Sequence, residues 1–593
     1  MLFFYVCTVV FVAGLNEPKS ERMHKVKARK TKNLCLINLA MDIVGKKQLA
    51  LVKKAAKNCK KASMTTLRGI IDYAKDTEWG KAHDFASMLY EENDDELVKL
   101  WQKRVPKADY EDFRPFVERH KNGEENILFP GKPKMYATTS GTTNAPKWIP
   151  ITDEYYDNIY NKMSTLWLYT FRMHRKDAYE GPALSIVGKA VEGYAPDGTV
   201  YGSVSGVTRR DIPAFLSHIH SAPAEVFEIE DYTARYYTIM RIGIEQDIHL
   251  IITANPSTIV EMRNNVNEFF DSYVDDIEKG TLNTNLNISK DIRAAIEPLL
   301  KPNPERAEEL RELKMQHPHI LPKHYWPNVK VLTTWKVGNT RVYMDKFKGE
   351  FPDDMLYQEF SYFSSECRTG LVLDGGNSTV LFPHMHYFEF IPEDEIESAT
   401  PHYKQIYELE KGKRYSVLVT TYAGLYRYDM NDLIEVTGFY GEIPTIEFVQ
   451  KINGIISMTG EKLHERQFID AVKTVEKDIG VKVRFFIGFA DLEESVYHFY
   501  YEFENPDIDR QMMEKFNGFV DEMLKKLNME YDAKRNSFRV KPPIPHFLEC
   551  NSFEKFKEEC LKRGYRDGQF KLNLLMQDEK RHAMFKELVK KEF

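Results

Sequence analysis

The sequence predicts an α/β protein: a large N-terminal domain in which helices cover β-sheets, and a smaller α+β domain at the C-terminus. Two observations support this prediction. From about residue 65 to 450, amphipathic helical patterns alternate with short apolar strands, as is typical of sheets covered by helices. After about residue 454 the order changes to a helix, two aromatic strands and further helices, which make a unit of small-domain size.

The individual elements follow from hydrophobic periodicity. Thr65 to Ala82 carries its apolar residues on one side and predicts a helix. Further along the large domain we expect strands at 249–253, 329–334 and 415–420, a less regular strand at 380–391, and a long helix at 257–279. In the C-terminal part we expect a helix at 461–477, strands at 482–489 and 496–503, a helix near 508–527 and a helical region from 552.

These elements predict four segments of the chain. Residues 1–33 form a leader, 34–453 the large domain, 454–460 a hinge with a glycine at each end, and 461–593 the C-terminal domain. At 593 residues, with 42% apolar and 13% aromatic residues, the chain is long enough for more than one large core.

The charge and the cysteines exclude some classes of protein. A formal charge of −7 is small for this length and argues against a dedicated nucleic-acid binder, which would have a basic footprint. The six cysteines are scattered, without a zinc-ligand spacing, so we interpret them as reduced structural thiols.

The N-terminal residues leave the location of the protein open. Residues 2–15 form an apolar run that is too short to span a bilayer comfortably and that resembles the core of a signal peptide without its basic flank. We expect a cytoplasmic protein, although secretory targeting stays possible on this evidence.

A basic stretch follows, with twelve Lys/Arg against one acid in residues 25–61. Its apolar residues predict a helix with one buried face. These residues are Leu34, Leu36, Ile37, Leu39, Ala40, Ile43 and Val44. A basic amphipathic helix can bind a membrane surface, but we favour a solvated lysine face on a helix docked to the domain.

The densest group of phosphate-binding residue types is segment 138–147, Thr-Thr-Ser-Gly-Thr-Thr-Asn-Ala-Pro-Lys. Backbone N–H groups, hydroxyl groups and one lysine can together bind a polyphosphate. The segment lacks the spacing of a Walker loop, and adenylate-forming enzymes place such a turn over the phosphates of ATP. An ordinary loop is the alternative. The candidate ATP ligands are Thr139, Ser140, Gly141, Thr142 and Thr143.

A second segment, residues 362–366, reads Tyr-Phe-Ser-Ser-Glu. The carboxylate of Glu366 can hold Mg²⁺ against ATP phosphates, while the aromatic residue and the backbone frame an adenine. An ordinary turn is the alternative. The candidate residues are Tyr362, Ser364, Ser365 and Glu366.

A third segment follows the strand at 415–420 and ends in Asp432. An aspartate just beyond a buried strand can accept hydrogen bonds from both hydroxyls of a ribose. Asp429 is a rival for this role, and a surface ion pair is the alternative. His384 and His386 share a strand, but no third metal ligand accompanies them, so we interpret them as structural.

Taken together, in this order and spacing, the three segments resemble the plant auxin-responsive Gretchen Hagen family of acyl acid–amido synthetases and its non-plant relatives, which belong to the adenylate-forming superfamily. The family patterns Ser-Ser-Gly-Thr-Ser, Tyr-Ala/Gly-Ser-Ser-Glu and Tyr-Arg-Tyr-Arg-Val-Gly-Asp are similar to residues 139–143, 362–366 and 426–432. In the third segment Asp429 replaces arginine and Asn431 replaces glycine. The resemblance covers about residues 35–593, and residues 568–572 look like the family's Gln-Tyr/Val-Lys segment.

The resemblance implies a two-step reaction. A carboxylate attacks the α-phosphorus of ATP to give an acyl-adenylate and pyrophosphate, and an amine then displaces AMP to form an amide. Catalysis would consist mostly of placement and charge stabilisation.

The resemblance also implies roles for particular residues. The hydroxyl residues of 139–143 would hold phosphate, Glu366 would hold Mg²⁺, and Asp432 would anchor the ribose. Lys571, on a mobile C-terminal domain, would neutralise charge during adenylation. Lys147 and Lys451 are lesser candidates, and Lys451 stands near a position where many adenylate-forming enzymes use arginine.

We therefore expect an ATP- and Mg²⁺-dependent ligase that joins a small carboxylic acid to an amine, and we expect the amine to be an amino acid. Two alternatives stay open: an acyl-adenylating ligase with a thiol acceptor, and a non-catalytic family member that binds nucleotide, which the altered third segment makes credible. We expect a monomer with no nucleic-acid partner and no stable membrane insertion.

Overall fold

The computed structural model describes residues 34–139, 147–212, 219–337, 342–452, 455–456, 461, 463–491, 494–536, 540–562 and 573–589. The chain divides into two compact units: Met1–Met430 with Glu435–Glu447 (unit 1), and Asn431–Ile434 with Phe448–Phe593 (unit 2). The predicted domain limits at 453 and 461 stay predictions, and most of the predicted hinge lies outside the described residues.

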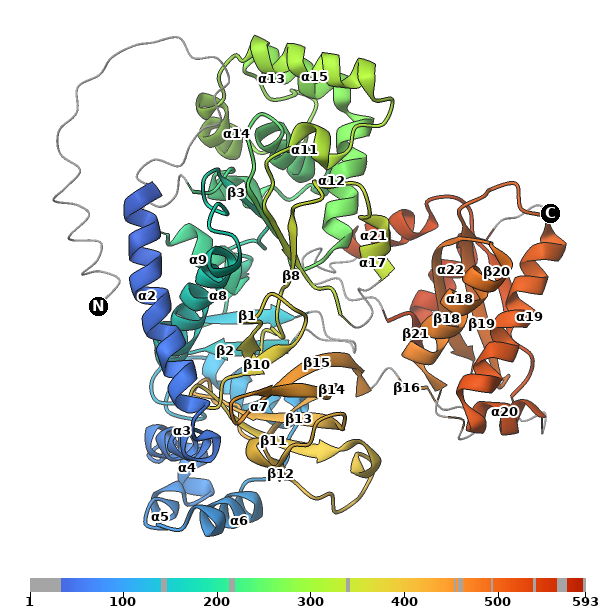
Figure 1. Ribbon diagram of the computed structural model, residues 1–593. Helices are drawn as coiled ribbons and strands as arrows, with labels where there is room; N and C mark the ends of the chain where they lie inside the picture. Colours follow the sequence, from blue (N-terminus) through green and yellow to red (C-terminus); the bar gives the residue numbers. More distant parts are fainter. Residues whose placement is uncertain are drawn as a thin grey trace, which may run out of the picture. The chain divides into compact units, whose positions relative to one another are not determined.

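Unit 1 begins with a series of helices, drawn in blue in Figure 1. They are α2 (Leu34–Ala55), α3 (Cys59–Ala74), α4 (Glu78–Ala82), α5 (Phe85–Met88), α6 (Asp94–Arg104) and α7 (Tyr110–Lys121). The prediction of one helix over 65–82 was wrong, because Thr77 separates α3 from α4. Its hydroxyl donates to the Ala74 carbonyl (2.7 Å) and accepts from the Gly80 N–H (3.0 Å), so it caps the start of α4.

Helix α2 lies beside α8 (Asn161–His174), as predicted for a docked helix, but the predicted buried face was partly wrong. Leu39 and Ile43 are exposed, whereas Ile37 and Val52 are buried. The contact is set by Gly45, where an added β-carbon would lie 2.1 Å from Cγ of Tyr169. This close approach packs the helix on α8 at Gly45, so its buried face includes residues such as Gln48 that hydrophobicity alone did not select.

Three β-sheets form the rest of the framework of unit 1. The first has the order β2 (Lys147–Ile151), β1 (Met135–Thr139), β5 (Val200–Gly202), β4 (Gly193–Tyr194). The second is parallel, with the order β3 (Ala183–Ser185), β6 (Leu250–Ile252), β7 (Val331–Thr334), β8 (Leu356–Glu359). The third has the order β12 (Lys404–Gln405), β11 (Tyr387–Pro392), β13 (Arg414–Thr420), β14 (Tyr428–Tyr440), β15 (Ile443–Lys451), β10 (Thr379–Leu381), β9 (Gly370–Leu371).

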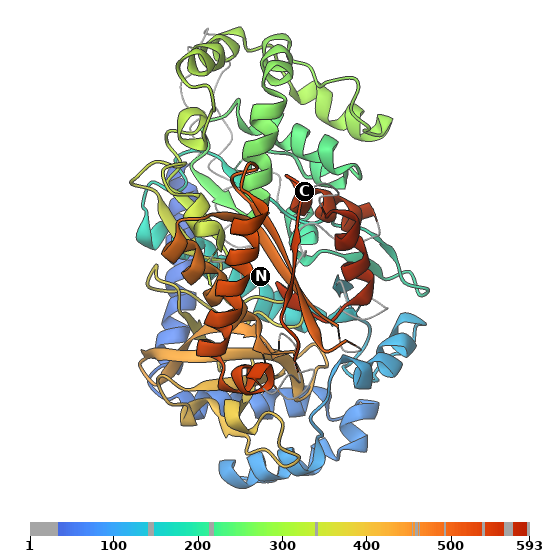
Figure 2. The same cartoon turned by 90° about the vertical axis from the view of Figure 1, so that its right-hand side faces the viewer.

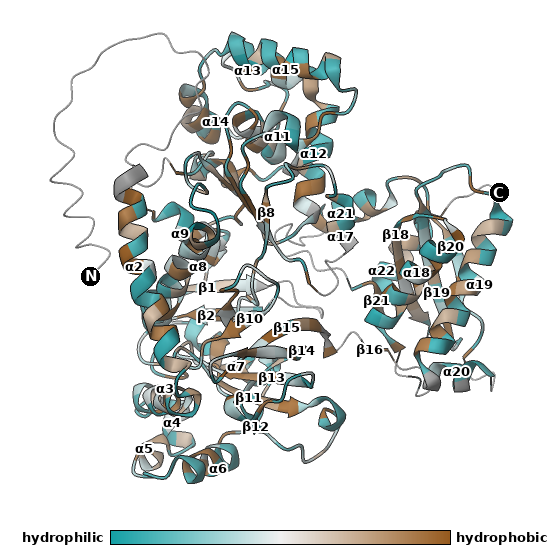
Figure 3. Ribbon diagram, in the orientation of Figure 1, coloured by the Kyte–Doolittle hydropathy of each residue, from teal (hydrophilic) through white to brown (hydrophobic). Residues whose placement is uncertain are grey.

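The remaining helices of unit 1 pack mainly around the second sheet, whose strands contribute Leu184, Ile251 and Leu332 to one hydrophobic core; Figure 3 shows hydrophobic residues in this region in brown. The π-helix is η1 (Tyr155–Tyr160), and the 3₁₀ helices are η2 (Ala224–Glu228), η3 (Glu297–Leu299), η5 (Glu393–Glu395) and η6 (Ile406–Glu408). The α-helices are α9 (Val204–Arg210), α11 (Tyr232–Gly243), α12 (Ser257–Glu268), α13 (Phe270–Lys279), α14 (Lys290–Ile296), α15 (Pro304–Gln316), α16 (Pro322–Tyr325) and α17 (Val342–Lys346).

The structure confirms the buried strands β6, β7 and β13 near their predicted positions, and with them the α/β class. Two longer predictions were wrong in detail. The region 380–391 contains two strands, β10 and β11, with a turn between them. The helix at 257–279 divides at Phe269, whose backbone leaves helical geometry (φ −103°, ψ 20°) while its ring packs against Tyr237 at 5.8 Å.

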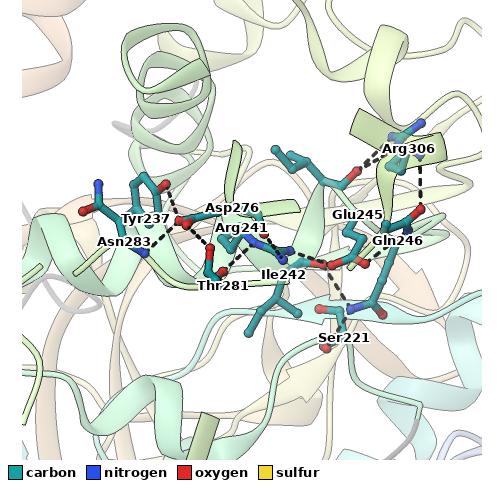
Figure 4. Close-up of polar contacts among 12 residues, drawn as sticks. Ser221, Tyr237, Arg241, Ile242, Glu245, Gln246, Asp276, Thr281, Asn283 and Arg306 are labelled. Atoms are coloured by element: carbon teal, nitrogen blue, oxygen red, sulfur yellow. Dashed lines mark hydrogen bonds and ion pairs between the residues drawn. The ribbon is translucent and has the colours of Figure 1, made fainter. Parts of the chain in front are cut away.

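A buried polar network holds helices α11 and α13 together (Figure 4). Arg241 has no exposed surface; it donates to the Asp276 carbonyl (2.8 Å) and pairs with Glu245 (2.6 Å). The Asp276 carboxylate accepts from the Tyr237 hydroxyl, the Thr281 hydroxyl and the Asn283 N–H, each at 2.8 Å. Because these buried charged groups are hydrogen-bonded, the network can fix the packing of the helices without leaving an uncompensated charge.

Unit 2 is built on a four-stranded sheet with the order β20 (Ile544–Phe547), β19 (Val496–Phe503), β18 (Val483–Asp491), β21 (Leu575–Met576). Its other elements are β16 (Ile455–Ile456), β17 (Leu463–His464), α18 (Glu465–Ile479), α19 (Arg510–Leu527), α20 (Met529–Asn536), α21 (Ser552–Lys562) and α22 (Glu579–Glu587). Ring contacts place α18 and α19 on one face of the sheet and α21 and α22 on the other, and Figure 2 shows this layering in orange and red. The predicted strands and helices of this part are confirmed to within a few residues.

Three histidines meet between the sheet and α22 in unit 2. The rings of His498 and His546 are joined by a 2.8 Å contact between Nδ1 and Nε2, and the ring centroid of His582 lies 4.7 Å from that of His498. Burial lowers the pKa of His546 to about 3 and of His582 to about 4, with nearby positive groups acting in the same direction. These imidazoles are therefore neutral in the folded unit.

We expect unit 2 to lose stability as the pH falls below 6.5, the ordinary pKa of histidine. The folded-state pKa values are depressed, so the unfolded chain takes up protons first and the stabilisation is lost from pH 6.5 down towards about 4. Hydrogen-exchange protection of β20 and α22, corrected for the intrinsic pH dependence of exchange, should fall in that window and fall less in His546→Gln. Protection that stays constant across the window would contradict this expectation.

Candidate functional site

The hydroxyl-rich segment connects two paired strands of unit 1. Thr139, the last residue of β1, is opposite Lys147, the first residue of β2. The side chain of Thr139 and all of Ser140, Gly141, Thr142 and Thr143 lie outside the described residues, so their roles stay predictions. Thr138 is buried and donates to Glu192 at 3.5 Å, which anchors the strand that leads into the segment.

Lys147 joins the first segment to the third. Its Nζ donates to the hydroxyl of Tyr428 at 3.2 Å and lies 5.8 Å from the ring centroids of both Tyr428 and Tyr110. The hydroxyl of Tyr110 in turn accepts from the N–H of Trp148 (2.6 Å). Two aromatic rings and a hydroxyl thus hold an ammonium group at the end of the segment, where a lysine can pair with phosphate.

The second segment forms a tight turn that presents Glu366. Phe363 and Arg368 pair across the base of the turn in an antiparallel bridge. The hydroxyl of Ser364 accepts from the N–H of Cys367 (3.1 Å), and the N–H of Ser364 donates to the Cys367 carbonyl (3.0 Å). Ser364 is therefore engaged in shaping the turn, whereas Ser365 and Glu366 lie at its partly exposed tip.

The base of this turn is tied to the third sheet and is locally strained. The N–H of Tyr362 donates to the hydroxyl of Thr379 on β10 (3.1 Å), and Tyr362 is buried. Ser361, just before it, has a left-handed backbone (φ 81°) that a serine rarely adopts. Its hydroxyl accepts from the Val372 N–H (3.0 Å) and its carbonyl from the Trp335 indole N–H (3.2 Å). Strain held by such contacts often marks a functional position.

Two groups beside the turn were missed by sequence reasoning. Burial raises the pKa of Glu359, at the end of β8, to about 7, and its carboxylate accepts from the N–H of Lys336 (2.6 Å). Arg368 has its guanidinium 3.8 Å from the ring centroid of Tyr160 and 4.6 Å from that of Phe363. It thereby links the turn to the helices η1 and α8. The only signal in the sequence was a charged residue within three positions of the segment: Glu359 before it and Arg368 after it.

The third segment begins with a buried structural arginine. Arg427 is 2% exposed and pairs through Nε with Glu389, 1% exposed, at 2.9 Å. It also donates to the carbonyls of Val105 (2.8 Å) and Gln102 (3.2 Å). The guanidinium is therefore committed to joining the start of the third segment to the N-terminal helices.

The two candidate aspartates of this segment have different surroundings. Asp429 forms an ion pair with Lys107 at 2.9 Å, so the surface ion pair that sequence reasoning kept as an alternative applies to this residue. Asp432 lies on β14, is 2% exposed and is grouped with unit 2. This difference favours Asp432 for the ribose, and that assignment stays a prediction.

The backbone conformation of Asn431 explains why asparagine can replace the glycine of the family pattern in the third segment. Its backbone is left-handed (φ 54°), a conformation that glycine adopts freely and that asparagine tolerates better than most residues. Asparagine at the glycine position of the pattern therefore keeps the backbone path and is no sign of a lost function.

Replacing Asn431 with glycine and with alanine tests this explanation. Both variants lack the amide, so they differ only in backbone preference, and we expect the glycine variant to be the more stable by about 1 kcal/mol. Denaturant titration of the two proteins measures the difference. Equal stability, or a more stable alanine variant, would show that the left-handed conformation does not matter.

The other predicted residues have simpler outcomes. The side chain of Lys451 and all of Lys571 lie outside the described residues. His384 and His386 are held neutral, because burial lowers their pKa values to about 4 and about 3.

The described residues contain no cluster of three or more His, Cys, Asp or Glu side chains that could hold a metal ion. A single glutamate on a partly exposed turn nevertheless fits Mg²⁺, which usually takes one or two carboxylates together with phosphate oxygens and water. Glu366 would hold the ion, which would supply positive charge to the phosphates of ATP.

The chain is similar to known proteins along most of its length. Three family models match it: the GH3 family N-terminal domain over residues 48–356, the GH3 family central domain over 379–451 and the GH3 family C-terminal domain over 466–580. The chain therefore belongs to the GH3 family, the auxin-responsive family that the three segments resemble. The predicted family is confirmed.

Individual relatives agree with this assignment. The chain is 24% identical to the indole-3-acetic acid-amido synthetase GH3.3 of Arabidopsis thaliana, covering 89% of this chain and 91% of that protein. It is 25% identical to the 4-substituted benzoates-glutamate ligase GH3.12 of the same plant, covering 80% and 86%. These relatives confirm the predicted class, an acid–amino acid ligase.

Solved structures establish the fold. The GH3.15 acyl acid amido synthetase matches with a TM-score of 0.79 at 22% identity, covering 92% of this chain and 96% of that one. A 2-hydroxyisobutyryl-CoA ligase matches with a TM-score of 0.51 at 11% identity, covering 96% and 97%. The predicted adenylate-forming fold is confirmed.

Proposed function

We propose that this protein is an ATP-dependent acyl acid–amido synthetase that adenylates a small carboxylic acid and transfers the acyl group to an amino acid. The observation that carries the proposal is the 362–367 turn, which is fixed from within by Ser364 and from below by Thr379, and which leaves Glu366 at its tip. A carboxylate on a fixed turn and a hydroxyl-rich segment that ends in a lysine are groups that adenylation can use. The names of the relatives support the same acid and amine chemistry.

The first chemical step follows from these residues. Residues 139–143 and Lys147 would bind the phosphates, and Glu366 would hold Mg²⁺. A substrate carboxylate then attacks the α-phosphorus, its oxygen forming the new P–O bond while the bond to pyrophosphate breaks. The carboxylate and the phosphates of ATP are both anions and repel each other. Fixed cationic and hydrogen-bonding groups therefore lower the barrier chiefly by placement and charge neutralisation.

The second step exchanges AMP for an amine. The amine nitrogen attacks the acyl carbon of the adenylate, loses a proton and expels AMP as the leaving group. We assign Asp432 to the ribose hydroxyls in both steps and Lys571 to the charge that develops in the first step. Because ATP is abundant inside cells, we also propose a cytoplasmic location.

The product formed from one acid distinguishes the proposal from its rivals. The protein is incubated with ATP, Mg²⁺ and a panel of aromatic and aliphatic acids, with either a mixture of the twenty amino acids or coenzyme A, and the products are identified by mass spectrometry. We expect an amide whose mass equals acid plus amino acid less water, absent in Asp432→Ala. A thioester with coenzyme A and no amide would identify the thiol-acceptor ligase, and ATP binding without any product would identify a non-catalytic member.

A further inference from the structure

The outward face of helix α2 combines large apolar side chains with lysines. Leu39, Ile43 and Leu51 are 56%, 52% and 41% exposed, although the opposite face of the helix packs against α8. Three of the twelve large hydrophobic residues that are exposed in the described part of the chain thus lie on this one helix. Isolated exposed apolar residues need no explanation, but several on one helix face mark an interaction surface.

Lysines share this face with the apolar residues. At 100° per residue, the exposed positions Leu39, Ile43, Lys47, Ala50 and Lys54 follow one stripe along the helix. Lys46 and Lys53 flank the stripe and are also exposed. The apolar residues dominate the first half of the face and the lysines the second half. We call these residues, with Leu51, the α2 outer face.

The electrostatic surroundings of the α2 outer face are positive. Asp42 is the one acidic residue of α2, and it pairs with Arg172 of α8 at 2.8 Å. The hydrogen bond from Arg172, together with the charges of Arg172, Lys46 and Lys176, holds the pKa of Asp42 below its usual value. The charge of Asp42 is therefore compensated mainly by Arg172. The sequence just before α2 has the same sign, with seven Lys/Arg against one acid in residues 19–33.

We propose that the α2 outer face docks this protein on an anionic lipid bilayer. A bilayer surface offers hydrocarbon to Leu39 and Ile43 and phosphate or carboxylate head groups to the lysines, so both halves of the face are satisfied at once. Lysine is a flexible point charge suited to a diffuse anionic surface, whereas recognition of individual carboxylates in a protein partner favours arginine. In this arrangement α2 lies on the bilayer surface and does not cross the membrane. Among the described residues no helix is long and apolar enough to cross a membrane.

Vesicle co-sedimentation of the full chain tests the proposal. Binding is measured to vesicles of phosphatidylcholine alone and of phosphatidylcholine mixed with phosphatidylserine. We expect binding only to the mixed vesicles, with an affinity that falls as salt is added. Lys46→Glu/Lys47→Glu removes two positive charges from this surface and should weaken binding by about thirtyfold or more. Leu39→Ser/Ile43→Ser should weaken it too.

A matched charge reversal elsewhere on unit 1 serves as the control. Lys411 and Lys413 are exposed in the turn before β13, and Lys411→Glu/Lys413→Glu changes the net charge equally. We expect this control to bind nearly as well as the unaltered protein, and all variants to keep their unfolding midpoint. The proposal is overturned if the unaltered protein does not bind the mixed vesicles. It is also overturned if the α2 variants bind like the control, since residues outside the α2 outer face would then account for the binding.

Discussion

Replacing Glu366 with glutamine is expected to lower the rate of acyl-adenylate formation by roughly two to three orders of magnitude, the usual loss when one group that stabilises a charged transition state is removed. The substitution preserves the size and shape of the side chain but removes the negative charge of the carboxylate that we assign to Mg²⁺ binding. The turn itself should survive, because its internal hydrogen bonds are made by Ser364 and Cys367. Pyrophosphate exchange measured against Mg²⁺ concentration should show both a lower maximum and a higher Mg²⁺ requirement.

The matched control for this prediction is Glu410→Gln, an exposed glutamate of unit 1 outside the three segments. It should exchange pyrophosphate like the unaltered protein. If Glu366→Gln keeps normal exchange and a normal Mg²⁺ requirement, the carboxylate does not hold the ion, and the assignment of the second segment is wrong.

Arg427→Met is expected to give the largest loss of stability of any single substitution considered, about 3–5 kcal/mol in unit 1. It removes one partner of an ion pair in which both side chains are almost completely buried, so Glu389 keeps an uncompensated charge. Glu389 also accepts from Gln102 (2.9 Å) and from the indole of Trp101 (3.3 Å), so the damage reaches helix α6. All six tryptophans of the chain lie between residues 79 and 335, so their fluorescence during denaturant unfolding reports on unit 1.

The control is Lys107→Met, which removes the partly exposed ion pair with Asp429 in the same region. Surface pairs of this kind contribute about 0–1 kcal/mol, so the unfolding midpoint should change little. Equal, small shifts of the unfolding midpoint for both variants would mean that the buried contacts of Arg427 do not contribute to the stability of unit 1.

Much of the fold was predictable because its strongest signals are local. The strands β6, β7 and β13 are short segments rich in β-branched and apolar residues, and β18 and β19 are rich in aromatic residues, so each could be located to within a few residues. The errors arose where a tertiary contact decided the outcome. Thr77 interrupts a helical pattern by capping, and Phe269 leaves the helix to pack on Tyr237. Gly45 lets α2 pack closely on Tyr169, a contact that periodicity could not anticipate.

The sequence located the segments of the candidate site, but it did not predict the role of each residue within them. Composition marked 362–366 and 426–432, yet it could not separate Ser364, which shapes its turn, from Glu366 at the tip. It favoured Asp432 but left Asp429 as a rival, whereas the structure shows that Lys107 engages Asp429 and that the sheet buries Asp432. The replacement of glycine by Asn431 suggested lost function, and only the backbone angle shows why asparagine fits.

Carboxylate-dependent exchange between ATP and pyrophosphate, measured over a panel of aromatic, indole and fatty acids, is the most direct test of acyl-adenylate formation by this protein. We expect exchange with at least one acid, abolished in Asp432→Ala and strongly reduced in Lys571→Ala, while both variants stay folded. Absence of exchange with every acid, from a folded protein that still binds Mg²⁺–ATP, would contradict this expectation.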